Sequence, residues 1–194
     1  VVVDVQADRS ACNGSSYYVS PSGNDTNAGT LAAPFATLAK ATQAITSFGS
    51  TIRLAAGTYL ETQQSLLAPG VCIEGAGPST VIQSTDTRIW TAIIGGSSPE
   101  GTDGHQHIAN LKLDGRNLQT FWAIQLSGRK NVSIHDVVVV DFRDRGVLIG
   151  GRDGSDEGPP SLWATGITFY NNTILNSAAY DLPGLGIYGR GGLN

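Results

Sequence analysis

The densest group of side chains able to do acid–base chemistry lies between two short apolar runs in the last third of the sequence. Residues 141–145 read DFRDR and supply the carboxylates of Asp141 and Asp144 and the guanidinium groups of Arg143 and Arg145. A guanidinium can bind a carboxylate through two parallel hydrogen bonds, so this segment could hold an acidic ligand. The same charges could instead form surface ion pairs that order a loop, which is a common and weak interaction.

A second group of carboxylates follows directly. Residues 152–158 read RDGSDEG, and Asp153, Asp156 and Glu157 offer hard oxygen ligands that could hold Ca²⁺. The segment does not have the full spacing of a calcium-binding loop, so a solvated acidic loop is the alternative. Calcium is therefore the one cofactor that the sequence suggests.

The elements that position these groups come from an internal repeat. Three segments, HIANLKLDG (107–115), NVSIHDVVVVDF (131–142) and GITFYNNTILNS (166–177), each hold two apolar pairs separated by a polar turn. The alignment brings together Ile108, Ile134 and Phe169, and it requires a one-residue offset at Ile174. Asn or Asp stands at each turn, where a left-handed backbone conformation is needed.

A third apolar run follows each unit, at 123–128, 146–151 and 185–191. A unit of three short strands cannot bury its own apolar face, whereas stacked units share one continuous core. The sequence therefore predicts an all-β parallel β-helix, with charged segments in the loops between strands. The side chains expected to point inward are Val132, Ile134, Val137, Val139, Val147 and Ile149.

The first third of the sequence has a different pattern. Residues 16–20 read as a strand and 21–30 as a turn-rich loop, and the spacing of Phe35, Leu38, Ala41, Ile45 and Phe48 predicts an amphipathic helix over 34–48. Such a helix would cap the open end of the stack, which would otherwise pair with other chains. We expect one domain over 1–194, with strand, loop and cap in 1–50 and coils in 51–194.

Composition limits the partners. The net charge of −4 leaves no basic field for nucleic acid, and no apolar run is long enough to cross a membrane. Cys12 and Cys72 allow one disulfide or two reduced thiols. Four N-x-S/T motifs, at Asn13, Asn24, Asn131 and Asn171, favour a secreted or cell-surface location only weakly, because such motifs arise by chance in a chain rich in Asn and Thr.

A family resemblance rests on the first third. The segment YYVSPSGNDTNAGTLAAPFATLAKA (17–41), followed by TIRLAAGTYLE (51–61), resembles secreted right-handed parallel β-helix proteins of the pectate-lyase-like superfamily. The resemblance implies a right-handed helix, secretion and a glycan partner. It says little about activity, because lyases, hydrolases, epimerases and non-catalytic proteins share the motif.

The resemblance also implies a binding groove along the outward face of the third strand of each coil. A polysaccharide lyase acting on a uronic-acid polymer needs a cation, a base and an acid there. The predicted catalytic set is Arg143, Arg145, Tyr188 and Arg190, and the predicted substrate-binding set is Trp122, Gln125, Asp144 and Tyr180. This placement aligns Tyr188 with Gln125 and Leu148.

Two other functions stay open from the sequence. A glycoside hydrolase on the same scaffold would need two facing carboxylates, for which the candidates are Asp141, Asp144 and Asp181. A non-catalytic carbohydrate-binding or adhesion module would need neither. Because no capping segment follows the last coil, the expectation is a truncated chain or an end covered by a partner or by further coils.

Overall fold

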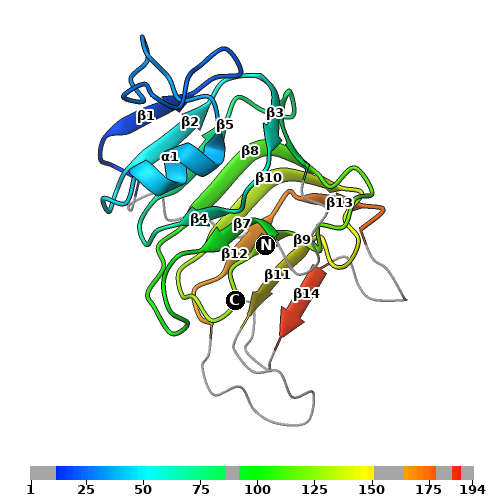
Figure 1. Cartoon of the computed structure of the whole chain (residues 1–194). Helices are drawn as coiled ribbons and strands as arrows, with labels where there is room; N and C mark the ends of the chain where they lie inside the picture. The colour runs from blue at the N-terminus through cyan, green and yellow to red at the C-terminus, as the bar shows by residue number, and fades with distance from the viewer. Residues whose placement is uncertain (1–11, 86–91, 151–163, 178–184, 189–194) are drawn as a thin grey trace.

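The computed structural model describes residues 12–85, 92–150, 164–177 and 185–188. The strands in these ranges are short, pair in parallel, and stack in two sheets (Figure 1). Sheet A contains β1 (Ser16–Val19), β2 (Thr51–Leu54), β3 (Gly57–Glu61), β5 (Cys72–Gly75), β6 (Thr80–Ser84), β8 (His107–Asp114), β10 (Ser133–Val140), β12 (Thr168–Tyr170) and β13 (Thr173–Leu175). Sheet B contains β4 (Ser65–Leu67), β7 (Ala92–Gly96), β9 (Trp122–Gln125), β11 (Val147–Gly150) and β14 (Leu185–Tyr188).

The register between coils agrees with the repeat. Ile134 of β10 pairs with Ile108 of β8 and with Phe169 of β12. Further along β10, Val138 pairs with Thr173 and Val139 with Ile174 of β13, in the same register as Ile134 with Phe169, so the predicted one-residue offset at Ile174 was wrong. Parallel pairing between successive coils supports the predicted parallel β-helix.

A polar bend in each long strand, β8 and β10, divides sheet A into two parts. The predicted turn residues have positive φ angles of 58° at Asn110, 53° at Asp136 and 51° at Asn171. Side-chain bonds span neighbouring bends, because the Asn172 carbonyl accepts from the backbone N–H of Val137 at 3.0 Å and its amide donates to the Ile134 carbonyl at 2.9 Å. The stack of polar bends therefore fixes where each long strand turns.

One hydrophobic core runs through the coils. All six side chains predicted to point inward are buried, with at most 1% of their surface exposed. The sequence patterns did not identify β4 and β7, two short strands of sheet B. Leu67 and Ile94 bring these strands into the same core as the repeat.

The helix is shorter than the sequence predicted. α1 (Leu38–Ala44) begins after Thr37, whose side chain accepts from the N–H of Lys40. Phe48 lies beyond the helix and is 62% exposed, so its predicted place on the buried face was wrong. The other four apolar residues of that face are buried in the core, and α1 lies against the first strands of the stack (Figure 1), where a cap is expected. In the described part of the chain, no helix has the length and apolar character that crossing a bilayer requires.

Two carboxylates hold the start of α1. Asp25 accepts from the backbone N–H groups of residues 36 and 37 at 2.8 and 3.0 Å. Glu61, at the end of β3, accepts from those of residues 38 and 39 at 2.6 and 3.2 Å. Burial, with a smaller contribution from the nearby charge of Asp25, raises the pKa of Glu61 despite these hydrogen bonds. The helix does not extend back to residue 34 because the backbone of Phe35 pairs with the chain at β1, donating to the Tyr18 carbonyl and accepting from the Ser20 N–H.

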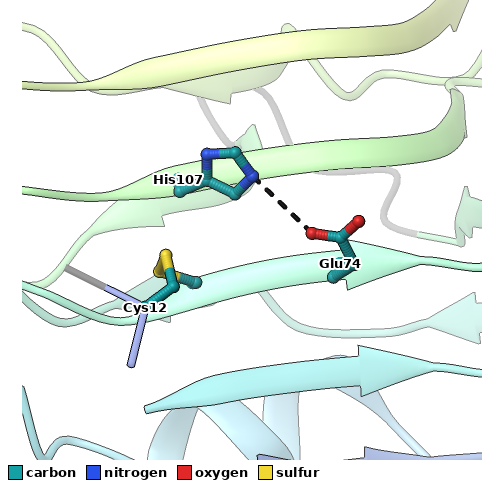
Figure 2. The surroundings of a disulfide bond; sticks show 4 residues. Cys12, Glu74 and His107 are labelled. Carbon is teal, nitrogen blue, oxygen red and sulfur yellow. Dashed lines mark ion pairs between the residues drawn. A yellow bond between two sulfur atoms is a disulfide. The ribbon is translucent and has the colours of Figure 1, made fainter. Parts of the chain in front are cut away.

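The two cysteines are joined. Cys12 and Cys72 form a disulfide, with their Cα atoms 6.0 Å apart and 60 residues apart in sequence (Figure 2). Of the two alternatives left open by the sequence, the disulfide is confirmed. It ties the segment before β1 to β5, the third strand of sheet A.

Candidate functional site

The loops that lead into sheet B are stacked like the strands. Backbone N–H groups of Arg143 and Asp144, in the loop before β11, donate to the carbonyls of Thr120 and Phe121 in the loop before β9, at 3.3 and 3.1 Å. This pairing brings together side chains from two successive coils. We call the set the loop cluster; it consists of Phe121, Trp122, Arg143, Asp144 and Arg145.

Asp144 is the centre of the loop cluster. Its Oδ2 accepts from the indole N–H of Trp122 at 3.1 Å and from Nη1 of Arg145 at 3.3 Å. Only 9% of the Asp144 side chain and 14% of the Arg145 side chain is exposed. The other carboxylate oxygen, Oδ1, is buried, and no described residue donates a hydrogen bond to it. Asp144 therefore orients Trp122 and Arg145 through one of its two oxygens.

Arg143 makes a different contact. Its guanidinium lies over the ring of Phe121, 5.6 Å from the centroid, and that ring meets Trp122 edge to face at 5.4 Å. A guanidinium stacked on an aromatic face keeps its N–H groups in its own plane, where they can bind an anion. The arrangement can present one half-buried cation beside an aromatic pair.

The outer row of sheet B differs from the sequence-based alignment. Gln125 pairs with Leu148 as expected, but Leu148 pairs with Gly186. Tyr188 pairs with Gly150, two residues further along the strand. The predicted row of Gln125, Leu148 and Tyr188 was therefore wrong for Tyr188, because the loop before β14 has a different length from the loop before β11.

Several predicted site residues lie outside the described residues. These are the catalytic candidate Arg190, the binding candidate Tyr180, the hydrolase candidate Asp181 and the calcium candidates Asp153, Asp156 and Glu157. Their assignments stay predictions. Among the residues that the structure does describe, no group of three or more His, Cys, Asp or Glu side chains is arranged to hold a metal ion.

The two described hydrolase candidates have separate partners. Asp141 sits in a left-handed turn with a φ of 60°, and its Oδ1 accepts from the side-chain amide of Asn176 at 3.3 Å. Asp144 is held by Trp122 and Arg145. Each carboxylate thus has a structural partner, which gives no specific support to a facing catalytic pair.

A buried cation was missed by sequence reasoning. Arg129, after β9, donates to the carbonyl of Ser127 at 2.5 Å, to that of Gly96 at 3.4 Å, and to that of Ser98. Burial lowers the pKa of Arg129, and the nearby charge of Glu100 opposes that shift. Arg129 therefore joins the loops that leave β7 and β9. Nothing in the spacing of the sequence distinguishes it from a surface arginine.

An aromatic row lies on the outside of sheet A. His135 and Tyr170 stack with their ring centroids 4.7 Å apart and their planes 13° apart. His135 is buried, and its Nδ1 lies 2.6 Å from a carboxylate oxygen of Asp136. These contacts link neighbouring coils.

Comparisons with known proteins fit this geometry. A protein-family profile described as "Protein of unknown function (DUF1565)" matches residues 21–67, which include the loop after β1, α1 and the first coil. The sequence matched none of the curated proteins with which it was compared.

Three solved structures share the fold at low identity. A rhamnogalacturonan lyase has a TM-score of 0.55 at 16% identity and is matched over 91% of this chain and 63% of its own. The pectate lyase Pel9A has a TM-score of 0.51 at 17% identity, over 92% of this chain and 48% of its own. ORF18 of Geobacillus virus E2 has a TM-score of 0.51 at 20% identity, over 57% of this chain and 23% of its own.

These identities show the fold alone. The chain spans about a quarter of the length of the viral protein and half to two thirds of the lengths of the two lyases. Together with the parallel stacked strands, the likenesses support a β-helix of the kind found in pectate and rhamnogalacturonan lyases.

Proposed function

We propose that this protein is a secreted, carbohydrate-active right-handed β-helix that binds a uronic-acid polymer along the outer face of sheet B and cleaves it by β-elimination. One observation carries the proposal. The loop cluster places two guanidinium groups and an oriented indole beside that face, on a fold shared with two polysaccharide lyases. The disulfide supports secretion, because such bonds persist in oxidising compartments.

The proposed reaction assigns roles to the cluster. Arg143 and Arg145 bind the uronate carboxylate, and neutralising it acidifies the neighbouring C–H. A base takes that proton, its electron pair forms the new C=C bond, and the glycosidic C–O bond breaks as an acid protonates the leaving oxygen. Tyr188 is the proposed acid, and Arg190 is the proposed further cation or base.

Supporting groups complete the proposed site. Trp122 offers an apolar ring for a sugar face, Asp144 positions that ring and Arg145, and Gln125 and Tyr180 hydrogen-bond the sugar hydroxyls. Ca²⁺ held by the acidic segment 152–158 would supply the same neutralisation of the substrate carboxylate as an arginine. The calcium requirement is part of the proposal and is tested with it.

The test is a panel of uronate polymers, each incubated with the protein with and without Ca²⁺, while absorbance at the unsaturated-product band is followed. We expect product from at least one polymer, and a loss of about a hundredfold or more in rate for Arg145→Ala. Lys40→Ala, on α1, is the matched control and should keep the full rate.

Other outcomes would redirect the proposal. If no uronate polymer gives unsaturated product but neutral glycans release reducing sugar, the result would support a hydrolase. If neither assay gives product but the protein binds a glycan, the result would support a non-catalytic module. Full activity of Arg145→Ala would remove the loop cluster from the reaction.

A further inference from the structure

A separate pocket lies on the outside of the first coils of sheet A. It has a volume of about 650 Å³, within the range of small-molecule sites, and its walls come from β1, β2, β5 and the loop between β1 and α1. We call it the sheet A pocket. Its polar and aromatic lining is Tyr18, Ser20, Ser22, Arg53 and Glu74, and the rest is mostly apolar. None of these residues belongs to the loop cluster.

Register alone brings its key side chains together. Tyr18 of β1 pairs with Arg53 of β2, and Arg53 pairs with Glu74 of β5. Side chains in one such row of a parallel sheet point to the same side, about 4.8 Å apart from strand to strand. An aromatic ring, a cation and a carboxylate therefore follow one another across the floor of the sheet A pocket.

Arg53 has unused hydrogen-bonding capacity. Its side chain is exposed, and its Nε donates to the hydroxyl of Ser16 at 3.1 Å, which fixes the direction of the guanidinium plane. No hydrogen bond joins its two terminal nitrogens to any described residue, and it makes no ion pair within the described residues. A planar group oriented in this way matches a carboxylate.

Glu74 is held in place beside Arg53. Its Oε1 accepts from the side-chain amide of Asn110 at 2.7 Å, and its Oε2 lies 3.7 Å from Nε2 of His107. Figure 2 shows the Glu74 carboxylate and the His107 ring facing each other from neighbouring strands. With 23% of its side chain exposed, Glu74 presents a fixed acceptor to the sheet A pocket.

The remaining wall is apolar and open to solvent. Leu31, in the loop after β1, is 74% exposed although it lines the sheet A pocket, and Pro34 and three alanines extend the same surface. Exposed apolar surface beside a few convergent polar groups is typical of a ligand site. With Tyr18 it offers two apolar surfaces for a flat, partly apolar molecule.

We infer that the sheet A pocket binds a uronic-acid sugar. The sugar carboxylate pairs with the free edge of Arg53, a ring hydroxyl donates to Glu74, and the C–H face of the ring lies on Tyr18. A phosphate-rich ligand is disfavoured by the adjacent carboxylate, and a neutral sugar would leave Arg53 unused. The inference does not depend on the reaction proposed at sheet B.

Calorimetric titration of the whole protein tests the ligand class. Galacturonate should bind more tightly than galactose, which lacks the carboxylate, and than succinate, which lacks the sugar ring. Arg53→Gln should weaken galacturonate binding by about ten- to a hundredfold, the value of a charge-assisted hydrogen-bonded pair. Equal binding of galactose and galacturonate, or unchanged binding by Arg53→Gln, would overturn the inference.

A second pair of variants separates this site from the loop cluster. Tyr18→Phe keeps the ring and should bind as well as the unsubstituted protein, whereas Tyr18→Ala should bind about tenfold more weakly. Arg143→Gln should remove only a galacturonate isotherm that arises at the loop cluster, and it should leave the isotherm that Arg53→Gln weakens unchanged, whether or not any polymer is cleaved. If Arg143→Gln abolishes galacturonate binding and Arg53→Gln does not, the uronate site lies on sheet B and the sheet A pocket is excluded.

Discussion

The loop cluster and the sheet A pocket use similar residues in opposite ways. In the loop cluster the cations come from one five-residue segment, and they are engaged by Asp144 and by the Phe121 ring. In the sheet A pocket the charges come from separate strands: Arg53 donates to Ser16, and Glu74 is held by Asn110 and His107. Charges adjacent in sequence can satisfy one another locally, whereas charges brought together by register are held by partners on other strands.

The difference predicts where substitutions act. Changes in the loop cluster should reduce stability as well as function, because its groups are buried and interdependent. Changes to the exposed groups of the sheet A pocket should affect binding with little effect on folding. Four substitutions test this division. The disulfide stabilises the region of the sheet A pocket, and Asp144 stabilises the loop cluster.

The largest loss of unfolding free energy is expected when the disulfide beside the sheet A pocket is removed. Cys72 lies two residues before Glu74 in β5. Replacing both cysteines by serine should lower the free energy of unfolding by about 4 kcal/mol, because the bond closes a loop of 60 residues. Urea denaturation measures it, and reducing the unsubstituted protein should give the same loss. A loss below about 1 kcal/mol would mean that packing alone holds this edge.

The next largest effect is expected from the centre of the loop cluster. Asp144→Ala leaves the Trp122 indole N–H without its acceptor and removes a carboxylate partner of Arg145, so we expect a loss of about 3 kcal/mol in unfolding free energy. Asp103→Ala is the control, because the Asp103 side chain is 57% exposed and pairs with His105 at the surface. Equal losses in the two variants would show that Asp144 is no more structural than a surface carboxylate.

Much of the fold could be predicted because one pattern repeats. Alternating apolar residues fixed the register of Ile134 and Val139, and Asn110 marked the bend, since few side chains adopt a left-handed backbone. β4 and β7 were missed because neither belongs to the aligned units. The helix was predicted too long because its start depends on the pairing of Phe35 with the segment of β1, which no local pattern reveals.

The candidate sites were less predictable from the sequence because their contacts join residues from different coils. Trp122 and Asp144 are 22 residues apart, and no sequence pattern pairs an indole with a particular carboxylate. The sheet A pocket did leave a usable signal. Aligning TIRL (51–54) with CIEG (72–75) places Arg53 beside Glu74, and extending that alignment to the first strand adds Tyr18.

A pH-dependent effect is expected at Glu61, which holds α1 beside the loop that walls the sheet A pocket. Because burial raises its pKa, the folded protein binds this proton more tightly than the unfolded chain. Its contribution to stability is therefore fully present below the ordinary glutamate pKa of 4.5 and is lost as the pH rises through the raised value.

The measurement is the difference in unfolding free energy between the unsubstituted protein and Glu61→Gln, taken from pH 4 to pH 7. Since glutamine does not titrate, other groups cancel, and the difference should favour the unsubstituted protein most at the acidic end. A difference that grows toward neutral pH would mean that the hydrogen bonds from residues 38 and 39 outweigh the burial of the charge.

The smallest effect on stability is expected for Arg53→Gln. The side chain is exposed and makes one hydrogen bond to a described residue, to Ser16, so the free energy of unfolding should change by no more than about 0.5 kcal/mol. Urea denaturation of this variant beside Asp144→Ala gives the comparison directly. A loss above about 1.5 kcal/mol would make Arg53 a structural residue. Near-native stability combined with lost galacturonate binding would instead mean that the arginine is exposed on this face for a ligand, because folding gains almost nothing from it.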